Sequence, residues 1–229
     1  MGKRIDSAQR GECAQDSAQH RLYGAQDMVR IRSNACAGCG ACCRGMGDTI
    51  VLDPYDVWQL TAGTGRSFEE LMGAGIDLHV EEGVILPHLM MRENTKSCTF
   101  LAEDGKCGIH SFRPGICRLF PLGREFHEDG NAYFIVPEGC VKSGLSKVRI
   151  DKWLGLPALP RYERFKSEWH SLVRKLRVRL AAEPSGEVQR DVSVYFLRTF
   201  FMTPYAGSSA EAFYDEFAKR RRAFETAAL

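Results

Sequence analysis

The stretch Cys36-Ala-Gly-Cys39-Gly-Ala-Cys42-Cys43 sets the character of this chain, because it places four thiols within eight residues. A Cys-x-x-Cys turn lets two thiolates face one ion or cluster while backbone amides point at the sulfurs, and a repeated step adds a third sulfur. A second group follows within the next hundred residues, at Cys98, Cys107, Cys117 and Cys140. The spacing therefore predicts a metal centre built from two separated segments.

Other uses of closely spaced thiols fit the sequence less well. A disulfide between the adjacent Cys42 and Cys43 would be strained, since the bond needs a particular separation of the two Cα atoms. A thioredoxin-like site lies where a strand passes into a helix, and no apolar strand leads into Cys36. Tetrahedral zinc accepts the same thiolate ligands as an iron–sulfur cluster, so both kinds of centre stay open.

Length and composition are typical of a soluble protein. The 229 residues, 44% hydrophobic and 26% charged, are enough to bury a core without metal as the only support. No apolar run approaches the length of a membrane span, and the N-terminal residues lack the hydrophobic stretch of a secretory signal. We therefore expect a cytoplasmic protein, in which glutathione and thioredoxin keep the thiols reduced.

Positive charge is concentrated between Lys142 and Ala182, where eleven Lys or Arg stand against three Asp or Glu. Such a segment can bind nucleic acid, anionic lipid or an acidic partner, but it is more often a solvated helix face. No nucleic-acid module, aromatic stacking platform or zinc-finger histidine spacing accompanies the charge. We expect a redox or protein partner rather than nucleic acid or a membrane.

The chain divides into three predicted parts. Residues 1–27 are rich in Gln, Ser and Ala and indicate a flexible leader, in which Cys13 is a free thiol. Residues 28–145 form the predicted cysteine-cluster domain, and residues 146–229 form a helical C-terminal extension that packs on it. The predicted fold class is α+β: a small irregular cysteine-rich metal-binding domain with short β-hairpins, followed by mainly α-helical structure.

Local signals predict the elements of these parts. Asp53 and Pro54 begin a short helix that Gly63 ends, and Ser67 with Glu70 forms a capping box for the next helix. Turn residues predict two hairpins, which join residues 76–80 with 84–90 and residues 123–127 with 133–136. Hydrophobic periodicity predicts three C-terminal helices, over residues 161–182, 188–202 and 209–223.

The second cysteine group carries a resemblance to a known family. It reads Cys98-Thr-Phe-Leu-Ala-Glu-Asp-Gly-Lys-Cys107-Gly-Ile-His110-Ser-Phe-Arg113-Pro-Gly-Ile-Cys117-Arg118-Leu-Phe-Pro. Together with the first cysteine run, this order of motifs resembles the bacterial YkgJ-type CxxCxxCC cysteine-cluster family, described as a zinc- or iron-chelating domain, over about residues 34–141. The resemblance implies a metal-binding domain. Members of the family are labelled iron–sulfur proteins or oxidoreductases, and a related cysteine motif occurs in flagellin lysine methylases.

The candidate metal ligands are the eight cysteines of the two groups. Eight thiolates are enough for two metal sites of four ligands each. Because the side chains of the adjacent Cys42 and Cys43 are expected to diverge, one of them can bind the first metal while the other binds the second. Our preferred hypothesis is a 4Fe-4S cluster on Cys36, Cys39 and either Cys42 or Cys43, completed by a cysteine of the second group. The remaining thiols can hold a second metal or cluster, and zinc is the alternative cofactor.

Charged residues near Cys117 are the other site candidates. Arg113 and Arg118 flank it, and a guanidinium there can offset the negative charge of several thiolates and raise the potential of a cluster. We therefore name both arginines as candidate cofactor-binding residues. His110, three residues after Cys107, gives the Cys-x-x-His spacing of a zinc ligand, but the family often has tyrosine at this place.

Three functions are compatible with these features. The first is an iron–sulfur or zinc protein whose centre moves electrons or organises a partner-binding surface. The second is an enzyme, either an iron–sulfur oxidoreductase or a protein-modifying methyl-transfer component, although the sequence has no dinucleotide-binding loop, Walker A sequence or nucleophile elbow. The third is a metal carrier or chelator with Cys42 and Cys43 as an exchangeable pair, selective for soft metals.

Overall fold

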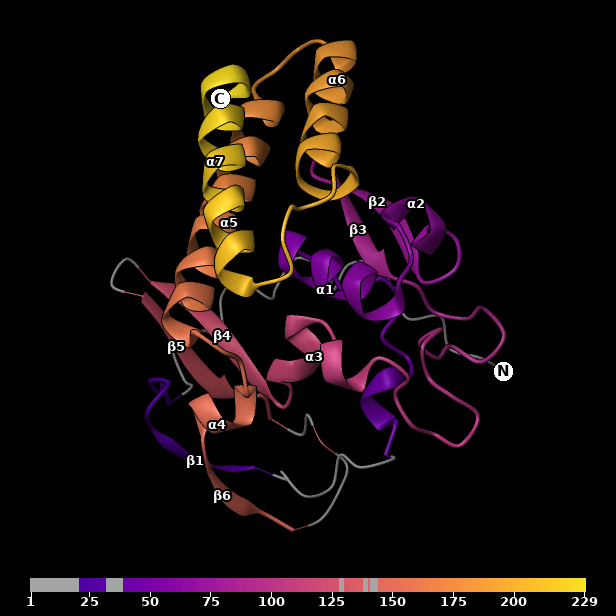
Figure 1. Ribbon diagram of the computed structural model, residues 1–229, viewed down its shortest axis with the longest axis vertical. Coiled ribbons are helices and arrows are strands. Elements are labelled where there is room, and N and C mark those ends of the chain that lie inside the picture. The colour runs from indigo at the N-terminus through magenta and orange to yellow at the C-terminus, as the bar shows by residue number, and fades with distance from the viewer. Residues whose placement is uncertain (1–20, 32–38, 128–129, 138–139, 141–143) are drawn as a thin grey trace, which may run out of the picture.

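The structure is a computed structural model, and it describes residues 21–31, 39–127, 130–137, 140 and 144–229. Short antiparallel strand pairs and small helices make up the first part of the chain, and longer helices follow (Figure 1). The predicted α+β class, with short hairpins before a helical C-terminal region, is confirmed. Cys13 and Cys36 lie outside the described residues, and the division at residues 27 and 145 stays a prediction.

The described strands form three two-stranded antiparallel sheets. Two are the predicted hairpins, which pair β2 (Ile76–Glu81) with β3 (Val84–Leu89) and β4 (Leu122–His127) with β5 (Gly130–Ile135). The third joins distant segments, because β1 (Met28–Ile31) pairs with β6 (Ser146–Arg149). The sequence does not predict this sheet, since each strand has only four residues and no turn connects the two.

Helix α1 (Pro54–Thr64) begins at the predicted cap but ends later than predicted. Asp53 Oδ1 accepts the Asp56 N–H at 2.9 Å and Asp56 Oδ2 accepts the Asp53 N–H at 3.2 Å, which completes a capping box. The prediction that Gly63 ends the helix is wrong, because Gly65 caps it with a φ of 69°. Gly63 lies in the last turn, where a Cβ atom would fall 2.4 Å from the Phe112 ring, so close packing explains this glycine.

Several of the described helices have only three to five residues. In α2 (Phe68–Leu71), the predicted capping box between Ser67 and Glu70 is confirmed. The others are η4 (Ala41–Cys43), η5 (His110–Phe112), α3 (Gly115–Leu119) and α4 (Ile150–Leu154). Helices of three to five residues are not stable alone, so contacts with other elements must fix their positions.

The C-terminal region consists of α5 (Leu159–Ala181), α6 (Gly186–Leu197), the π-helix η6 (Arg198–Met202) and α7 (Ala210–Ala228). The three predicted helices are therefore confirmed, and the first two begin two residues earlier than predicted, at Leu159 and Gly186. The end of the second adopts a π-helix, and the third extends to Ala228. Among the described helices, none combines the length and the apolar character that crossing a membrane requires.

An aromatic core joins α1 to the C-terminal helices, which stand beside it in Figure 1. Tyr55 of α1 lies edge-on to Phe213 of α7, with ring centroids 5.2 Å apart, and stacks on Tyr214 at 5.6 Å. Phe165 of α5 lies edge-on to Phe217 of α7 at 4.7 Å. Such pairs add to the stability that apolar burial provides. The C-terminal helices and α1 thus share one packed core.

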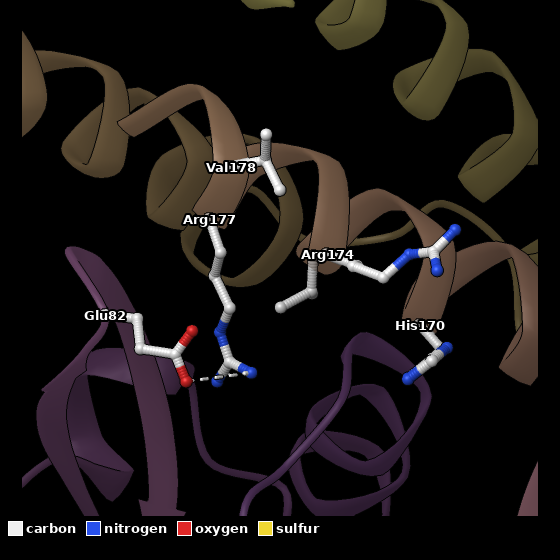
Figure 2. A pocket seen from close by; sticks show the side chains of 6 residues that line it. Glu82, His170, Arg174, Arg177 and Val178 are labelled. Carbon is white, nitrogen blue, oxygen red and sulfur yellow. Dashed lines mark ion pairs between the residues drawn. The ribbon is translucent and has the colours of Figure 1, made fainter. Parts of the chain in front are cut away.

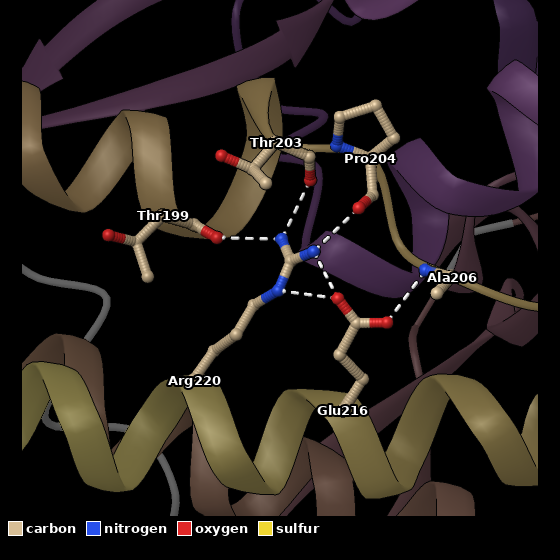
Figure 3. Close-up of polar contacts among 6 residues, drawn as sticks. All are labelled: Thr199, Thr203, Pro204, Ala206, Glu216 and Arg220. Carbon is tan, nitrogen blue, oxygen red and sulfur yellow. Dashed lines mark hydrogen bonds and ion pairs between the residues drawn. The ribbon is translucent and has the colours of Figure 1, made fainter.

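Arg220 of α7 fixes the segment that connects η6 to α7 (Figure 3). Its guanidinium forms an ion pair with Glu216, and the other Glu216 oxygen accepts the Ala206 N–H at 2.6 Å. The guanidinium also donates to three carbonyl oxygens, those of Thr199 at 2.8 Å, Thr203 at 2.7 Å and Pro204 at 2.6 Å. The planar fork of five donors suits this arrangement, which a lysine could not reproduce.

We expect Arg220→Gln to lower the free energy of unfolding by about 2–4 kcal/mol, because Glu216 and three carbonyl oxygens lose their cation. Urea-induced unfolding followed by circular dichroism measures the change. Arg222→Gln on the same helix is the matched control, since Arg222 is exposed, and we expect it to change stability by less than about 0.5 kcal/mol. Equal losses in the two variants would contradict the role of the cluster.

Candidate metal centre

Backbone contacts bring the two cysteine groups together. The Cys98 N–H donates to Cys43 O at 2.7 Å. Gly40, with a φ of 58°, approaches the second group so closely that a Cβ atom would lie 2.9 Å from Gly105 O. Only glycine combines this backbone conformation with so close an approach at low cost. The segment that ends the first cysteine run and the turn between Cys98 and Cys107 therefore lie side by side.

Arg92 fixes the turn that begins at Cys98. Its guanidinium donates to the carbonyl oxygens of Cys98 at 2.9 Å, Thr99 at 2.5 Å and Leu101 at 3.1 Å. Three carbonyls held by one cation define the path of the turn and hence the position of the Cys98 thiol. Sequence reasoning missed Arg92, because an arginine six residues before a cysteine belongs to no motif.

Five thiols of the two groups share one electrostatic environment: Cys42, Cys43, Cys98, Cys107 and Cys117. Burial raises the pKa of Cys117 most, and negative charge on Asp56 and on three of the other thiols raises it further. The hydrogen bond to Cys42 raises the pKa of Cys43 most, followed by burial and by charge on its neighbours. Because each thiolate disfavours the ionisation of the next, a cation is needed for several of them to be deprotonated together.

Cys42 has the most stable thiolate of the group. Its pKa is lowered to about 6, chiefly because the Cys43 thiol donates a hydrogen bond to it. Burial opposes this effect, while the backbone N–H of Cys42 and the charge of Arg113 reinforce it. Cys42 is exposed whereas Cys43 is half-buried. The group therefore presents one ionised sulfur to solvent at neutral pH.

Backbone N–H groups stabilise two further sulfurs. Burial raises the pKa of Cys98, and hydrogen bonds from the N–H groups of Phe100 and Leu101 oppose the rise. Burial likewise raises the pKa of Cys107, against the Ile109 N–H and the charge of Arg113. In both turns the N–H two residues after the cysteine points at its sulfur. This is a feature of the tight turns that hold metals and clusters.

The two candidate arginines lie in different surroundings. The charge of Arg113 lowers the pKa of both Cys42 and Cys107. Its Nη1 lies 3.1 Å from His110 Nε2 and donates to His110 O at 2.7 Å, and burial and this arginine lower the pKa of His110. Arg118 is buried and donates to Ser111 O at 3.0 Å. Arg113 thus stabilises the thiolates of Cys42 and Cys107, whereas Arg118 binds a backbone carbonyl. Contact of either arginine with a cofactor stays a prediction.

The cysteine thiols suit a soft metal, but the described side chains do not yet form a complete set of ligands around one metal ion. None of the seven described cysteines forms a disulfide. In the described part of the chain, no three His, Cys, Asp or Glu side chains already surround one point as metal ligands do. Closing a site therefore requires rotation of the thiols or a ligand from outside the described residues, such as Cys36. Cys39 and Cys140 are half-buried free thiols, and their place in the site stays a prediction.

Asp56 connects α1 to the helix that carries Cys117. Its Oδ1 accepts the Gly115 N–H, the first of α3, at 2.7 Å. Burial and then the charge of Asp53 raise the pKa of Asp56 to about 7, against Lys166 and the two backbone N–H groups. Sequence reasoning missed this role, because a carboxylate three residues after a helix cap predicts only the local capping box.

A cavity of about 400 Å³ lies apart from the thiols, between the β2–β3 turn and α5 (Figure 2). In Figure 2, Arg177 points toward Glu82, 3.7 Å away, and it also pairs with Glu81 at 2.7 Å. Arg161 likewise pairs with Asp215. Part of the charge of the basic 142–182 segment is therefore neutralised within the molecule, as on a solvated helix face, and the absence of a nucleic-acid partner stays a prediction.

We expect iodoacetamide to modify Cys42 of the metal-free protein at a rate that rises through pH 6, because the thiolate is the reactive form and its pKa is about 6. Cys43 should react slowly over the same range, since its pKa is raised. Peptide mass spectrometry measures both rates. Cys43→Ala removes the hydrogen-bond donor and should move the Cys42 midpoint up toward about 8.5. A wild-type midpoint already near that value would contradict the hydrogen-bonded pair.

Comparison with known proteins gives one match. The model of the CxxCxxCC family, described as "Putative zinc- or iron-chelating domain", matches residues 35–140. Neither the curated proteins nor the solved structures gave a significant match. The matched segment contains all eight cysteines of the two groups, together with Arg92, Asp56 and Arg113. Residues 35–140 of this chain are therefore similar to the CxxCxxCC family, whose description names the chelation of zinc or iron.

Proposed function

We propose that this protein binds an iron–sulfur cluster on its cysteine thiolates and uses it to transfer electrons or to organise a partner. The proposed ligands are Cys36, Cys39, one of the adjacent Cys42 and Cys43, and a cysteine of the second group. The observation that carries the proposal is that the fold brings thiols of both groups together: the Cys98 N–H donates to Cys43 O at 2.7 Å, and negative charge on each of five thiols disfavours ionisation of its neighbours, so a cation is required to hold them as thiolates. A zinc- or iron-chelating family agrees with this requirement.

The surroundings of the thiols suit electron transfer. A 4Fe-4S cluster exchanges single electrons at a potential set by net charge, hydrogen bonds to sulfur and solvent exposure, whereas zinc is redox-silent. The backbone N–H groups at Cys98 and Cys107 and the charge of Arg113 all favour added negative charge at the site. Cys42 is exposed, which gives a partner access to one of the sulfurs.

A metal carrier is the second candidate, and one observation favours it. Cys42 and Cys43 form a hydrogen-bonded thiol pair of which the first member is exposed and ionised near neutral pH. An acceptor protein can attack a metal most easily through such a solvent-facing ligand. In this role the pair would release zinc or iron, while the buried Cys98 retains its position.

The metal content of protein purified without oxygen tests the proposal. We expect iron and acid-labile sulfide in similar amounts, together with a broad visible absorption band that bleaches with dithionite. Zinc in equal amount to protein, with no sulfide, would replace the cluster by a zinc site and favour the carrier. Protein that takes up neither metal, even after reconstitution with iron and sulfide, would contradict metal binding altogether.

Single substitutions identify the ligands. We expect at least one of Cys98→Ser, Cys107→Ser and Cys117→Ser to lower the bound metal by at least about ten-fold, since removal of a thiolate costs more than removal of a supporting group. Cys13→Ser is the matched control, because this cysteine belongs to neither group, and should leave metal content unchanged. Metal content is measured by elemental analysis of each variant after identical reconstitution. Full metal loading of all three variants would exclude these second-group thiols as ligands.

A further inference from the structure

The position of Cys117 depends on contacts that α3 makes with other elements. The helix has five residues, too few to be stable alone. At its beginning, the Gly115 N–H donates to Asp56 Oδ1 at 2.7 Å, and at its end Leu119 O accepts from Trp153 Nε1 at 3.1 Å. Any displacement of the first contact therefore moves Cys117, which lies two residues later.

The Asp56 carboxylate is itself held by a buried ion pair from the C-terminal region. Asp53 and Asp56 are 3% and 2% exposed, and each binds the backbone N–H of the other. Lys166 of α5 donates to Asp53 Oδ2 at 2.5 Å. Buried carboxylates need such partners, because burying an unpaired charge is costly. Lys166 thus keeps the start of α1, and with it Asp56, in place.

Tyr162, one turn before Lys166 on α5, touches α3 directly. A Cβ atom built on Gly115 would lie 2.3 Å from Tyr162 Oη, so the hydroxyl occupies the space that any other residue at this position would need. The Tyr162 hydroxyl is buried and makes no hydrogen bond of good geometry with the described residues. The Tyr162 ring packs on Tyr55 and under the Arg124 guanidinium, and these contacts hold the hydroxyl against the first residue of α3.

We propose that α5 is the positioning element for Cys117, with Tyr162 and Lys166 holding the start of α3. Tyr162 acts by contact with Gly115, and Lys166 acts through the Asp53–Asp56 pair. Because α5 begins after residue 140, a region outside the family domain would set the geometry of its thiol site. The inference rests on the proposed function, since the position of Cys117 matters when the thiols bind metal.

A rescue experiment on the full-length metal-free protein tests the contact. Gly115→Ala places a methyl group against the Tyr162 hydroxyl, and we expect about ten-fold weaker binding of cobalt(II), the probe, with a weaker thiolate-to-cobalt absorption band. Alkylation of Cys117 should become several-fold faster while that of Cys98 is unchanged. Gly115→Ala combined with Tyr162→Phe should restore both values, because the next tyrosine atom lies 3.6 Å from the added carbon. Tyr162→Phe alone should bind cobalt as the wild type does.

A folded Gly115→Ala variant with wild-type cobalt binding and alkylation would overturn the proposal, and so would a double variant that recovers neither. If Gly115→Ala does not fold, cobalt binding by Lys166→Met tests the proposal instead. Lys166→Arg keeps the positive charge and should restore the binding that Lys166→Met loses. Lys175→Met on the same helix is its matched control, since Lys175 pairs with Glu225 and its side chain is 56% exposed. Lys166→Met should weaken cobalt binding and Lys175→Met should not; equal behaviour would reject the role of Lys166. A wild type that binds no cobalt would count against the proposed function, while the Cys117 alkylation rates would still test α5.

Discussion

Two buried carboxylates at the start of α1 connect the main parts of the molecule. All four of their oxygens have a partner: two backbone N–H groups within the capping box, the Gly115 N–H and the Lys166 ammonium. Burying two acidic groups side by side would be strongly unfavourable without these contacts. The start of α1 is therefore fixed relative to both α3, which carries Cys117, and α5, which belongs to the C-terminal helices.

Stability and site geometry come from different kinds of contact in this protein. The C-terminal helices and α1 share a densely packed aromatic core, with Tyr55, Phe165 and Phe213 almost completely buried. Around the thiols, helices are short and positions are set by polar contacts, such as those of Arg92 with three carbonyls. The hydrophobic core nevertheless reaches the site, because Cys98 is buried in it and Cys43, Cys107 and Cys117 pack against it.

The sequence predicts those elements whose signals are local. The Asp53 cap and the Ser67 capping box depend on residues within three positions of each other, and both hairpins have a turn between their strands. The fold class and the resemblance to the metal-chelating family follow from similarly short patterns. By contrast, Gly63 was misread, because its reason is the Phe112 ring almost fifty residues later.

Contacts between distant segments were beyond sequence reasoning for the same physical reason. The pairing of β1 with β6 and the bond from Asp56 to Gly115 depend on how complete elements pack, which no short pattern records. The site shows the same limit. Spacing predicts thiols as metal ligands, but how eight of them divide between centres depends on side-chain directions: the adjacent Cys42 and Cys43 thiols, expected to diverge, form a hydrogen bond with each other.

The β1–β6 pair has a consequence for how the thiol-bearing segment joins the rest of the molecule. The two strands flank residues 35–140, and their antiparallel register sets Ile31 opposite Ser146. A long stretch of chain thus leaves and rejoins the molecule at neighbouring points, which is the arrangement that tolerates insertion of one unit into another. Because α1 lies inside this segment and shares its aromatic core with α5 and α7, the segment that leaves and returns at β1 and β6 is nevertheless packed into the rest of the molecule rather than separate from it.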